Sequence, residues 1–320
     1  MALLELNDLT VTLQIPDGTV YAVNTANLQL EPGQTVALVG ESGSGKSMTA
    51  RAIMGLLPPS GMVRSGSIRF AGNELTTLSE QERRALRGNR IAMIFQEPMT
   101  SLNPVLRIGD QVMEPLLLHR GLDKQQARLQ AIDLLRQVGV ASPEQRISDY
   151  PHQLSGGQRQ RVMIAMALAC DPEILIADEP TTALDVTIQA QILELIDQLR
   201  RDKGLALLLI THDLGIVAQR ADQVHVMYAG RIVESGPAQE LLERPLHPYT
   251  RGLLASLPEN SLPGQPLVTI PGHPPRLTGL PAGCPFKDRC PDARTICAEQ
   301  MPASHRLNSG HTVTCWNYLL

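Results

Sequence analysis

The pattern of apolar and polar positions changes along the chain. Up to about residue 95, apolar and polar residues alternate or β-branched residues recur, as in LLELNDLTVTLQI and GSIRFAG, and TVALVG is a short apolar run. Such stretches are typical of strands. From about 96 to 150 the apolar residues follow a helical period; DKQQARLQAIDLLRQVGV places Ala127, Ile132, Leu134 and Leu135 near one face and ends at Gly139. We therefore expect a strand-rich part followed by a helical part.

After about residue 150, apolar runs alternate with amphipathic stretches. EILIAD and LALLLITHD predict buried strands, VTIQAQILELIDQLRRDKG predicts the helix between them, and QVHVMYAGRIVESG predicts further strand. Buried strands separated by helices favour a mostly parallel α/β sheet. Ten of the 24 prolines follow Leu257. We therefore expect no compact α/β continuation beyond about residue 245.

Composition narrows the class of protein. The chain has 320 residues, of which 43% are hydrophobic and 19% charged, and its net charge of -4 gives no general reason to expect nucleic acid. The N-terminus does not resemble a signal peptide, and the longest uncharged apolar run, VMIAMALAC, is half of the ~18 residues that a membrane span needs. We expect a soluble, cytoplasmic protein, where clustered cysteines indicate metal ligands more than disulfides.

The segment GESGSGKS fits the pattern G-x-x-x-x-G-K-[ST] between a predicted strand and the helical MTARAIMGLL. Glycines let backbone N–H groups turn toward phosphate oxygens, and a helix N-terminus favours the same anion. Lys46 is expected to reach the β- and γ-phosphates, and Ser47 to offer its hydroxyl to Mg²⁺. The predicted nucleotide-binding residues here are Gly40, Glu41, Ser42, Gly43, Ser44, Gly45, Lys46, Ser47 and Met48.

A second acidic element follows in ILIADEP. The strand from Ile174 to Ala177 delivers two carboxylates at its end. Asp178 is predicted to hold the Mg²⁺ water shell, and Glu179 to orient the attacking water. Alone, an apolar strand ending in acids is a weak signal, and its position after the phosphate loop strengthens it.

Between these elements lies LSGGQRQR, and with the phosphate loop it resembles the ATP-binding cassette family of ATPases. Gln96 in IFQEP matches the family's Q-loop, TALD at 182–185 its D-loop and His212 in ITHD its switch histidine. Tyr21 stands where an aromatic residue stacks on adenine in many members. The resemblance implies an α/β fold: a P-loop NTPase (RecA-like) core with an antiparallel β subdomain and a helical subdomain at about 96–160, inside a nucleotide-binding domain of residues 1–245.

The resemblance also implies roles for these residues. Glu179 would polarise water and His212 would contact the γ-phosphate. Gln96 would touch Mg²⁺, and Asp185 would lie at a subunit interface. The helix after LSGGQ would present its N-terminus to ATP held by a facing subunit, through Ser155, Gly156, Gly157 and Gln158. No hydrolytic position is substituted, which favours an active ATPase over a nucleotide-binding scaffold without turnover.

From HPYTRGLLASLP onward, residues 246–320 resemble the C-terminal extension of dipeptide and oligopeptide importer ATPases, most of all the D-type subunit of the dipeptide importer. This implies an ATP-driven motor, a translocase subunit, at the cytoplasmic face of the inner membrane. Its partners would be a second homologous ATPase, two permease subunits docking on QEPMTSLNPVLRIGDQVMEPLLLHRG, and an extracytoplasmic peptide-binding protein. A homodimer stays open, and so does the cargo: dipeptides, longer peptides, D-amino-acid dipeptides, nickel or glutathione.

The main alternative is a soluble cassette protein that acts on DNA or ribosomes. Repair proteins of this family insert long coiled coils or zinc modules between the phosphate loop and the signature. Residues 40–154 leave room only for a compact helical region. The translation proteins usually carry two cassettes, and this chain has one. Both comparisons favour the transport motor.

Four cysteines stand in the proline-rich tail with the spacing C-x₅-C-x₆-C-x₁₇-C: Cys284, Cys290, Cys297 and Cys315. Little apolar sequence surrounds them, so we predict that they gather on a metal that folds the tail. The spacing itself does not decide between a cluster, zinc and no metal. The family resemblance implies a [4Fe–4S] cluster. Cys170, in the apolar MIAMALAC, is predicted to be a core residue.

Overall fold

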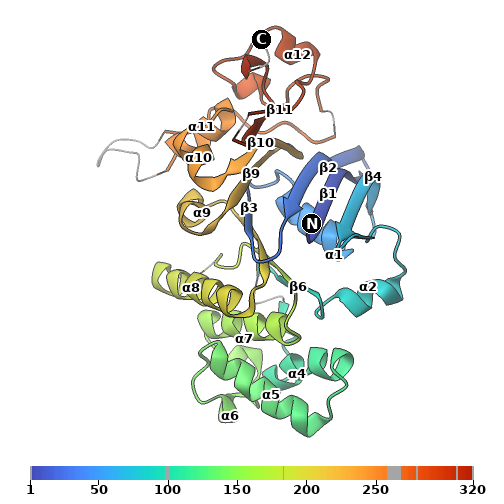
Figure 1. Ribbon diagram of the computed structural model, residues 1–320, viewed down its shortest axis with the longest axis vertical. Helices are drawn as coiled ribbons and strands as arrows, with labels where there is room; N and C mark the ends of the chain where they lie inside the picture. Colours follow the sequence, from blue (N-terminus) through green and yellow to red (C-terminus); the bar gives the residue numbers. More distant parts are fainter. Residues whose placement is uncertain are drawn as a thin grey trace. The chain divides into compact units, whose positions relative to one another are not determined.

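The computed structural model of this chain describes residues 2–97, 101–182, 184–257, 268–278, 280–307 and 309–318. The chain divides into two compact units (Figure 1). The first unit comprises Met1–Leu30, Thr35–Thr76 and Ile210–Leu320, and the second comprises Glu31–Gln34 and Thr77–Leu209. Both ends of the chain therefore belong to the first unit.

The first unit contains a four-stranded antiparallel sheet in the order β2-β1-β4-β5. Its strands are β1 (Leu4–Ile15), β2 (Gly18–Leu30), β4 (Gly61–Phe70) and β5 (Asn73–Glu74). In β1 the alternation seen in the sequence places Leu4, Leu6 and Val11 in the core. The predicted strand-rich start and antiparallel β subdomain are confirmed.

The first unit also contributes strands to a second sheet, in the order β11-β12-β10-β9-β3. They are β3 (Thr35–Val39), β9 (Gln223–Tyr228), β10 (Arg231–Pro237), β11 (His305–Arg306) and β12 (Thr312–Val313). The strands β3 and β9 are parallel, whereas β10 returns antiparallel to β9 through the left-handed residues Ala229 and Gly230. The sheet is mixed because this short turn leaves no room for the crossover that a parallel neighbour requires.

The tail continues this sheet, against expectation. Strand β12 pairs antiparallel with β10, with Glu234 opposite Val313 and Ser235 opposite Thr312. The prediction that the α/β structure stops near residue 245 is therefore wrong in this respect. The helical segments of the first unit are α1 (Lys46–Met54), α9 (Leu214–Arg220), α10 (Ala238–Glu243), α11 (Pro248–Ala255), α12 (Ile296–Glu299), η3 (Lys287–Arg289) and η4 (Trp316–Tyr318).

The second unit combines buried strands with a helical part. Strands β6 (Ile91–Ile94) and β7 (Ile174–Asp178) are parallel, β8 (Ala206–Thr211) lies beside β7, and every residue of the three is buried. Burial on both faces explains their continuous apolar runs. The helical segments are α2 (Glu80–Leu86), α4 (Ile108–His119), α5 (Lys124–Gln137), α6 (Pro143–Arg146), η1 (Pro151–Gln153), α7 (Gly156–Leu168) and α8 (Val186–Lys203) (Figure 1). The predicted helical region and alternating α/β part are confirmed.

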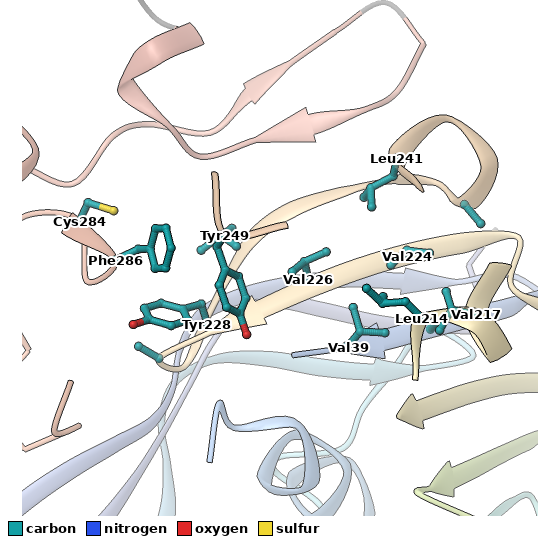
Figure 2. Close-up of a cluster of buried hydrophobic side chains, with 14 of the residues drawn as sticks. Val39, Leu214, Val217, Val224, Val226, Tyr228, Leu241, Tyr249, Cys284 and Phe286 are labelled. Atoms are coloured by element: carbon teal, nitrogen blue, oxygen red, sulfur yellow. The ribbon is translucent and has the colours of Figure 1, made fainter. Parts of the chain in front are cut away.

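The core of the first unit includes residues of the tail. Tyr228 of β9, Tyr249 of α11 and Phe286 of the tail face one another (Figure 2), with ring centroids 4.6, 5.2 and 5.4 Å apart. All three side chains are fully buried, and Cys284 and Cys297 belong to the same hydrophobic cluster. Aromatic contacts of this kind stabilise a core beyond the area that they bury.

The predicted metal site in the tail is contradicted. Cys284, Cys290, Cys297 and Cys315 do line one small hollow. Within the described part of the chain, however, no group of three or more His, Cys, Asp and Glu side chains is arranged to hold a metal ion. The prediction of a [4Fe–4S] cluster and the zinc alternative are therefore wrong, as is the assignment of the tail as metal-binding.

The prediction fails because the tail packs against the hydrophobic core of the first unit and does not need a metal to fold. The metal was predicted because too little apolar sequence surrounds the cysteines, but Phe286 packs into the core shared with β9 and α11. Burial also raises the pKa of the Cys284 thiol to about 11. Cys170, as predicted, is a core residue with 1% exposure.

Among the described residues, no helix combines the length and the apolar character that crossing a membrane requires.

Candidate nucleotide-binding site

The phosphate loop connects β3 to α1 and is packed tightly against neighbouring backbone. Gly40 and Gly45 have φ angles of +151° and +111°. A Cβ atom at Gly40 would lie 2.1 Å from the carbonyl oxygen of Met227, and one at Gly45 would lie 2.2 Å from that of Ala22. No side chain fits at either position, which explains why the pattern requires glycine there.

Lys46 and Ser44 fit a phosphate ligand. The Lys46 side chain is buried at 5% exposure, and its ammonium donates to the carbonyl oxygens of Gly40 at 2.7 Å and Glu41 at 3.0 Å. The hydroxyl of Ser44 is buried and has no hydrogen-bond partner within the described part of the chain. A buried cation and an unpaired hydroxyl in a glycine-rich loop suit a phosphate group.

The rest of the loop is more open, except at Glu41. Ser42 and Gly43 are exposed, and Ser47 and Met48 lie in the first turn of α1, both half-buried. The backbone N–H of Glu41 donates to the Tyr249 hydroxyl at 2.9 Å, and its carboxylate pairs with Arg289. Sequence reasoning missed both partners, because Tyr249 and Arg289 lie more than 200 residues from Glu41 and neither stretch of sequence indicates the contact.

Tyr21 lies on β2, half-buried, and the guanidinium carbon of Arg64 lies 5.9 Å from its ring centroid. Its backbone N–H donates to the carbonyl oxygen of Leu277 at 3.1 Å. His212 follows β8 directly and is exposed. Next to it, Asp213 caps α9 by accepting from the N–H groups of Gly215 and Ile216.

The second unit holds the acidic strand end. Asp178 ends β7 and is buried at 4% exposure. Glu179 follows with a left-handed φ of +48°. Its Oε2 accepts from Nε2 of Gln96 at 3.1 Å and from the hydroxyl of Thr182 at 2.9 Å. The structure thus brings Gln96 and Glu179 together, a contact that the sequence analysis did not predict, and adds Thr182.

Helix α7 begins at the signature sequence. Ser155 is its N-cap: the hydroxyl accepts from the N–H of Gln158 at 3.3 Å, and the Gln158 amide oxygen accepts from the N–H of Ser155 at 3.0 Å. This capping box fixes the helix start and leaves Ser155 and Gly156 exposed. A Cβ at Gly157 would approach the Ile188 side chain to 2.8 Å. The exposed N-terminus of the helix is therefore accessible to an anion.

The D-loop residue Asp185 is exposed and caps α8 by accepting from the N–H of Ile188 at 2.9 Å. Beside it, Val186 is 83% exposed. Ala183, in the same motif, lies outside the described residues.

The sequence of this chain matches known protein families. Residues 23–182 match the ABC transporter family, and residues 233–297 match the C-terminal region of oligopeptide and dipeptide transporters. The oligopeptide transport ATP-binding protein OppD of Salmonella typhimurium is 53% identical over 94% of this chain and 89% of its own length. The dipeptide transport ATP-binding protein DppD of Bacillus subtilis is 51% identical over 98% of this chain and 94% of its own.

Solved structures agree with the fold. The dimeric ATP-binding cassette MJ0796, in a post-hydrolysis state with ADP and phosphate, superposes with a TM-score of 0.66 and 29% identity, and the match covers 73% of this chain and 98% of that one. The predicted P-loop NTPase core with an antiparallel sheet and a helical part is thereby confirmed. The chain belongs to the ABC transporter family of ATPases, in the branch that carries the oligopeptide/dipeptide transporter C-terminal region.

Proposed function

We propose that this chain is the motor subunit of an importer for dipeptides or oligopeptides, and that it hydrolyses ATP to drive transport. The observation that supports it most is Glu179, which directly follows the buried Asp178 and is held by Gln96 and Thr182. A carboxylate fixed by two hydrogen bonds at a strand end is suited to orient a water molecule for attack on a phosphoryl group.

In this proposal the phosphate loop and Tyr21 bind ATP. The Lys46 ammonium neutralises the phosphates, the Ser44 hydroxyl donates to a phosphate oxygen, and the Tyr21 ring stacks on adenine. Mg²⁺, when bound, neutralises the developing phosphate charge. Ser47, Gln96 and Asp178 carry the oxygen donors that such a hard cation prefers.

Hydrolysis uses Glu179 and His212. Water attacks the γ-phosphorus, the bond to the β-phosphate oxygen breaks, and ADP and phosphate leave. Glu179 accepts a hydrogen bond from the attacking water and so aligns its lone pair with phosphorus. His212 contacts the γ-phosphate and stabilises its charge.

We further propose that two ATPase chains act together. The exposed N-terminus of α7, with Ser155, Gly156, Gly157 and Gln158, would bind the γ-phosphate of ATP on a facing chain, and Asp185 would lie at the same interface. The dimeric state of the solved cassette supports this arrangement. A second, homologous ATPase is the partner that we favour, with two membrane permease subunits and an extracytoplasmic peptide-binding protein. The chain would then lie peripherally on the cytoplasmic face of the inner membrane.

The domain boundaries that we propose are 1–245 for the nucleotide-binding domain, with its helical subdomain at about 96–160, and 246–320 for the extension. The oligopeptide and dipeptide names of the relatives support peptides as cargo.

Transport can be tested with the chain copurified with its native membrane subunits and reconstituted in liposomes. We expect ATP-dependent accumulation of labelled dialanine or a longer alanine peptide, lost with Lys46→Met. ATP hydrolysis without uptake of any di- to pentapeptide, or copurification with ribosomes or DNA instead of membrane proteins, would contradict the proposal.

A further inference from the structure

The C-terminal extension reaches back to the phosphate loop. Arg289, in η3 of the extension, forms a two-pronged ion pair with Glu41, the residue after Gly40: Nη1 lies 2.7 Å from Oε2, and Nη2 lies 2.9 Å from Oε1. The exposed fractions of the two side chains are 5% and 27%. Such a paired geometry, shielded from water, is stronger than a surface ion pair.

The guanidinium of Arg289 is fixed on its other sides as well. Its Nε donates to the carbonyl oxygen of Pro271 at 3.0 Å, and its Nη2 donates to that of Ile270 at 3.3 Å. Its Cζ lies 5.7 Å from the centroid of the Tyr228 ring, within cation–π range. The hydrogen bond with Glu41 raises the pKa of Arg289 above its usual value. Arg289 is therefore a permanent cation held in one place.

A second side chain of the extension holds the same loop residue. The hydroxyl of Tyr249, in α11, accepts the backbone N–H of Glu41 at 2.9 Å. Tyr249 is fully buried within the aromatic core (Figure 2), and burial raises the pKa of its hydroxyl. Backbone and side chain of Glu41 are thus both bound to residues beyond position 245.

The ion pair between Arg289 and Glu41 affects the charge that the phosphate loop presents to ATP. Glu41 puts a carboxylate into a loop whose ligand is a polyanion, and a like charge nearby weakens binding. Arg289 neutralises that charge, and its two hydrogen bonds hold the carboxylate in one conformation. The extension also contacts Tyr21, the residue proposed to stack on adenine: the Tyr21 N–H donates to the carbonyl oxygen of Leu277.

We propose that the extension is a working part of the nucleotide site, and that Arg289, aided by Tyr249, is a positioning residue that neutralises and orients Glu41 so that the loop accepts ATP. This inference rests on the proposed function. It assigns the extension a role in setting nucleotide affinity.

The test compares ATP dissociation constants of the full chain by calorimetry. Arg289→Met leaves the Glu41 carboxylate unpaired, and we expect the affinity for ATP to fall about tenfold. Glu41→Gln should improve the affinity, because it removes the carboxylate while Arg289 stays as a cation near the loop. The double variant, Glu41→Gln with Arg289→Met, should return to within about threefold of the wild type. Arg289→Lys keeps the charge but loses the two-pronged geometry and should lie in between.

A matched control is Arg251→Met. Arg251 pairs with Asp292 at 2.8 Å in the same extension, with exposed fractions of 47% and 43%, and it does not touch the loop. We expect its ATP affinity to equal that of the wild type. In the assembled complex, Arg289→Met should raise KM for ATP much more than it lowers kcat.

The outcomes separate the two proposals. Equal ATP affinity of wild type and a folded Arg289→Met variant would overturn the inference and leave the proposed function intact. A loss in Glu41→Gln as large as in Arg289→Met would overturn the charge argument, since a merely structural tie predicts equal losses. If Arg289→Met does not fold, Glu41→Gln and Arg289→Lys decide alone. A wild-type chain that binds no ATP would overturn both proposals.

Discussion

Gln96 donates a hydrogen bond from Nε2 to Oε2 of Glu179 at 3.1 Å. Thr182 donates to the same oxygen at 2.9 Å. The carboxylate that we assign to water activation is therefore oriented by the Q-loop on one side and by the start of the D-loop on the other. Any movement of the Q-loop would change the orientation of the catalytic group, which couples the two motifs directly.

Replacing Gln96 tests this coupling. Gln96→Leu removes the amide donor and should lower kcat about tenfold, because the carboxylate of Glu179 loses its orientation. The affinity for ATP without Mg²⁺ should change little, whereas loss of the amide oxygen should weaken the binding of Mg²⁺. Steady-state ATP turnover in the assembled complex is the measurement. Thr182→Val, which removes the other donor, should give a loss of similar size. Unchanged kcat in both variants would show that these hydrogen bonds do not position Glu179.

Lys46 should decide ATP binding. The ammonium is buried in the glycine-rich loop and donates to the carbonyl oxygens of Gly40 and Glu41, which fixes a cation where a phosphate group would bind. Lys46→Met should weaken ATP binding at least about 100-fold, as loss of a charge-assisted contact to phosphate requires. Calorimetric titration with ATP measures this, and circular dichroism verifies the fold. Binding within a few-fold of the wild type would refute the assigned role.

Gly45 should tolerate no side chain. Gly45→Ala forces a left-handed φ of +111° and a Cβ 2.2 Å from the carbonyl oxygen of Ala22. We expect a loss of about 3 kcal/mol in the free energy of unfolding together with loss of ATP binding. Gly72→Ala is the control, because its φ is +80° but nothing lies within 4 Å of its Cβ. It should cost about 1 kcal/mol and leave ATP affinity unchanged. Equal effects in the two variants would argue against close packing of the loop.

His247 predicts a pH dependence of stability. Its ring is buried at 1% exposure, Nδ1 accepts the N–H of Tyr249, and burial lowers its pKa to about 4 from the ordinary 6.5, although Glu234 acts in the opposite direction. Between these values the unfolded chain binds a proton that the folded chain does not. The contribution of His247 to the free energy of unfolding is therefore fully present above about pH 6.5 and is lost as the pH falls from there toward 4.

His247→Asn keeps a cap acceptor without the titration. From pH 7 to pH 5 the wild type should lose about 2 kcal/mol more of unfolding free energy than this variant does. His225, whose pKa burial also lowers to about 4, is present in both proteins and cancels. Urea unfolding at the two pH values gives the comparison, and identical losses would contradict the buried neutral state of His247.

Much of the fold was predictable because its signals are local. The phosphate loop and the buried runs of β7 and β8 each depend on neighbouring residues. The same is true of the acidic strand end and the signature helix, whose residues are contiguous in the sequence. The hydrogen bond between Gln96 and Glu179, which lie 83 residues apart, was not predicted.

The rest depends on contacts between distant positions. Arg289 and Glu41 are 248 residues apart, and nothing in the sequence near either residue indicates the other. The packing of Phe286 on Tyr228 and the pairing of β12 with β10 are of the same kind. Because these contacts were invisible in the sequence, the tail looked too poor in apolar residues to fold, and its cysteines were wrongly assigned to a metal.

The central claim is that Glu179 makes this chain an ATP-hydrolysing motor. Glu179→Gln retains the hydrogen-bonding shape of the side chain and removes its charge, so ATP binding should persist while turnover falls by about 100-fold or more. The decisive measurement is kcat for ATP in the assembled transporter, with ATP affinity determined on the same preparation. Wild-type affinity with turnover near zero is the result that we predict. Turnover close to that of the wild type in Glu179→Gln would contradict the account.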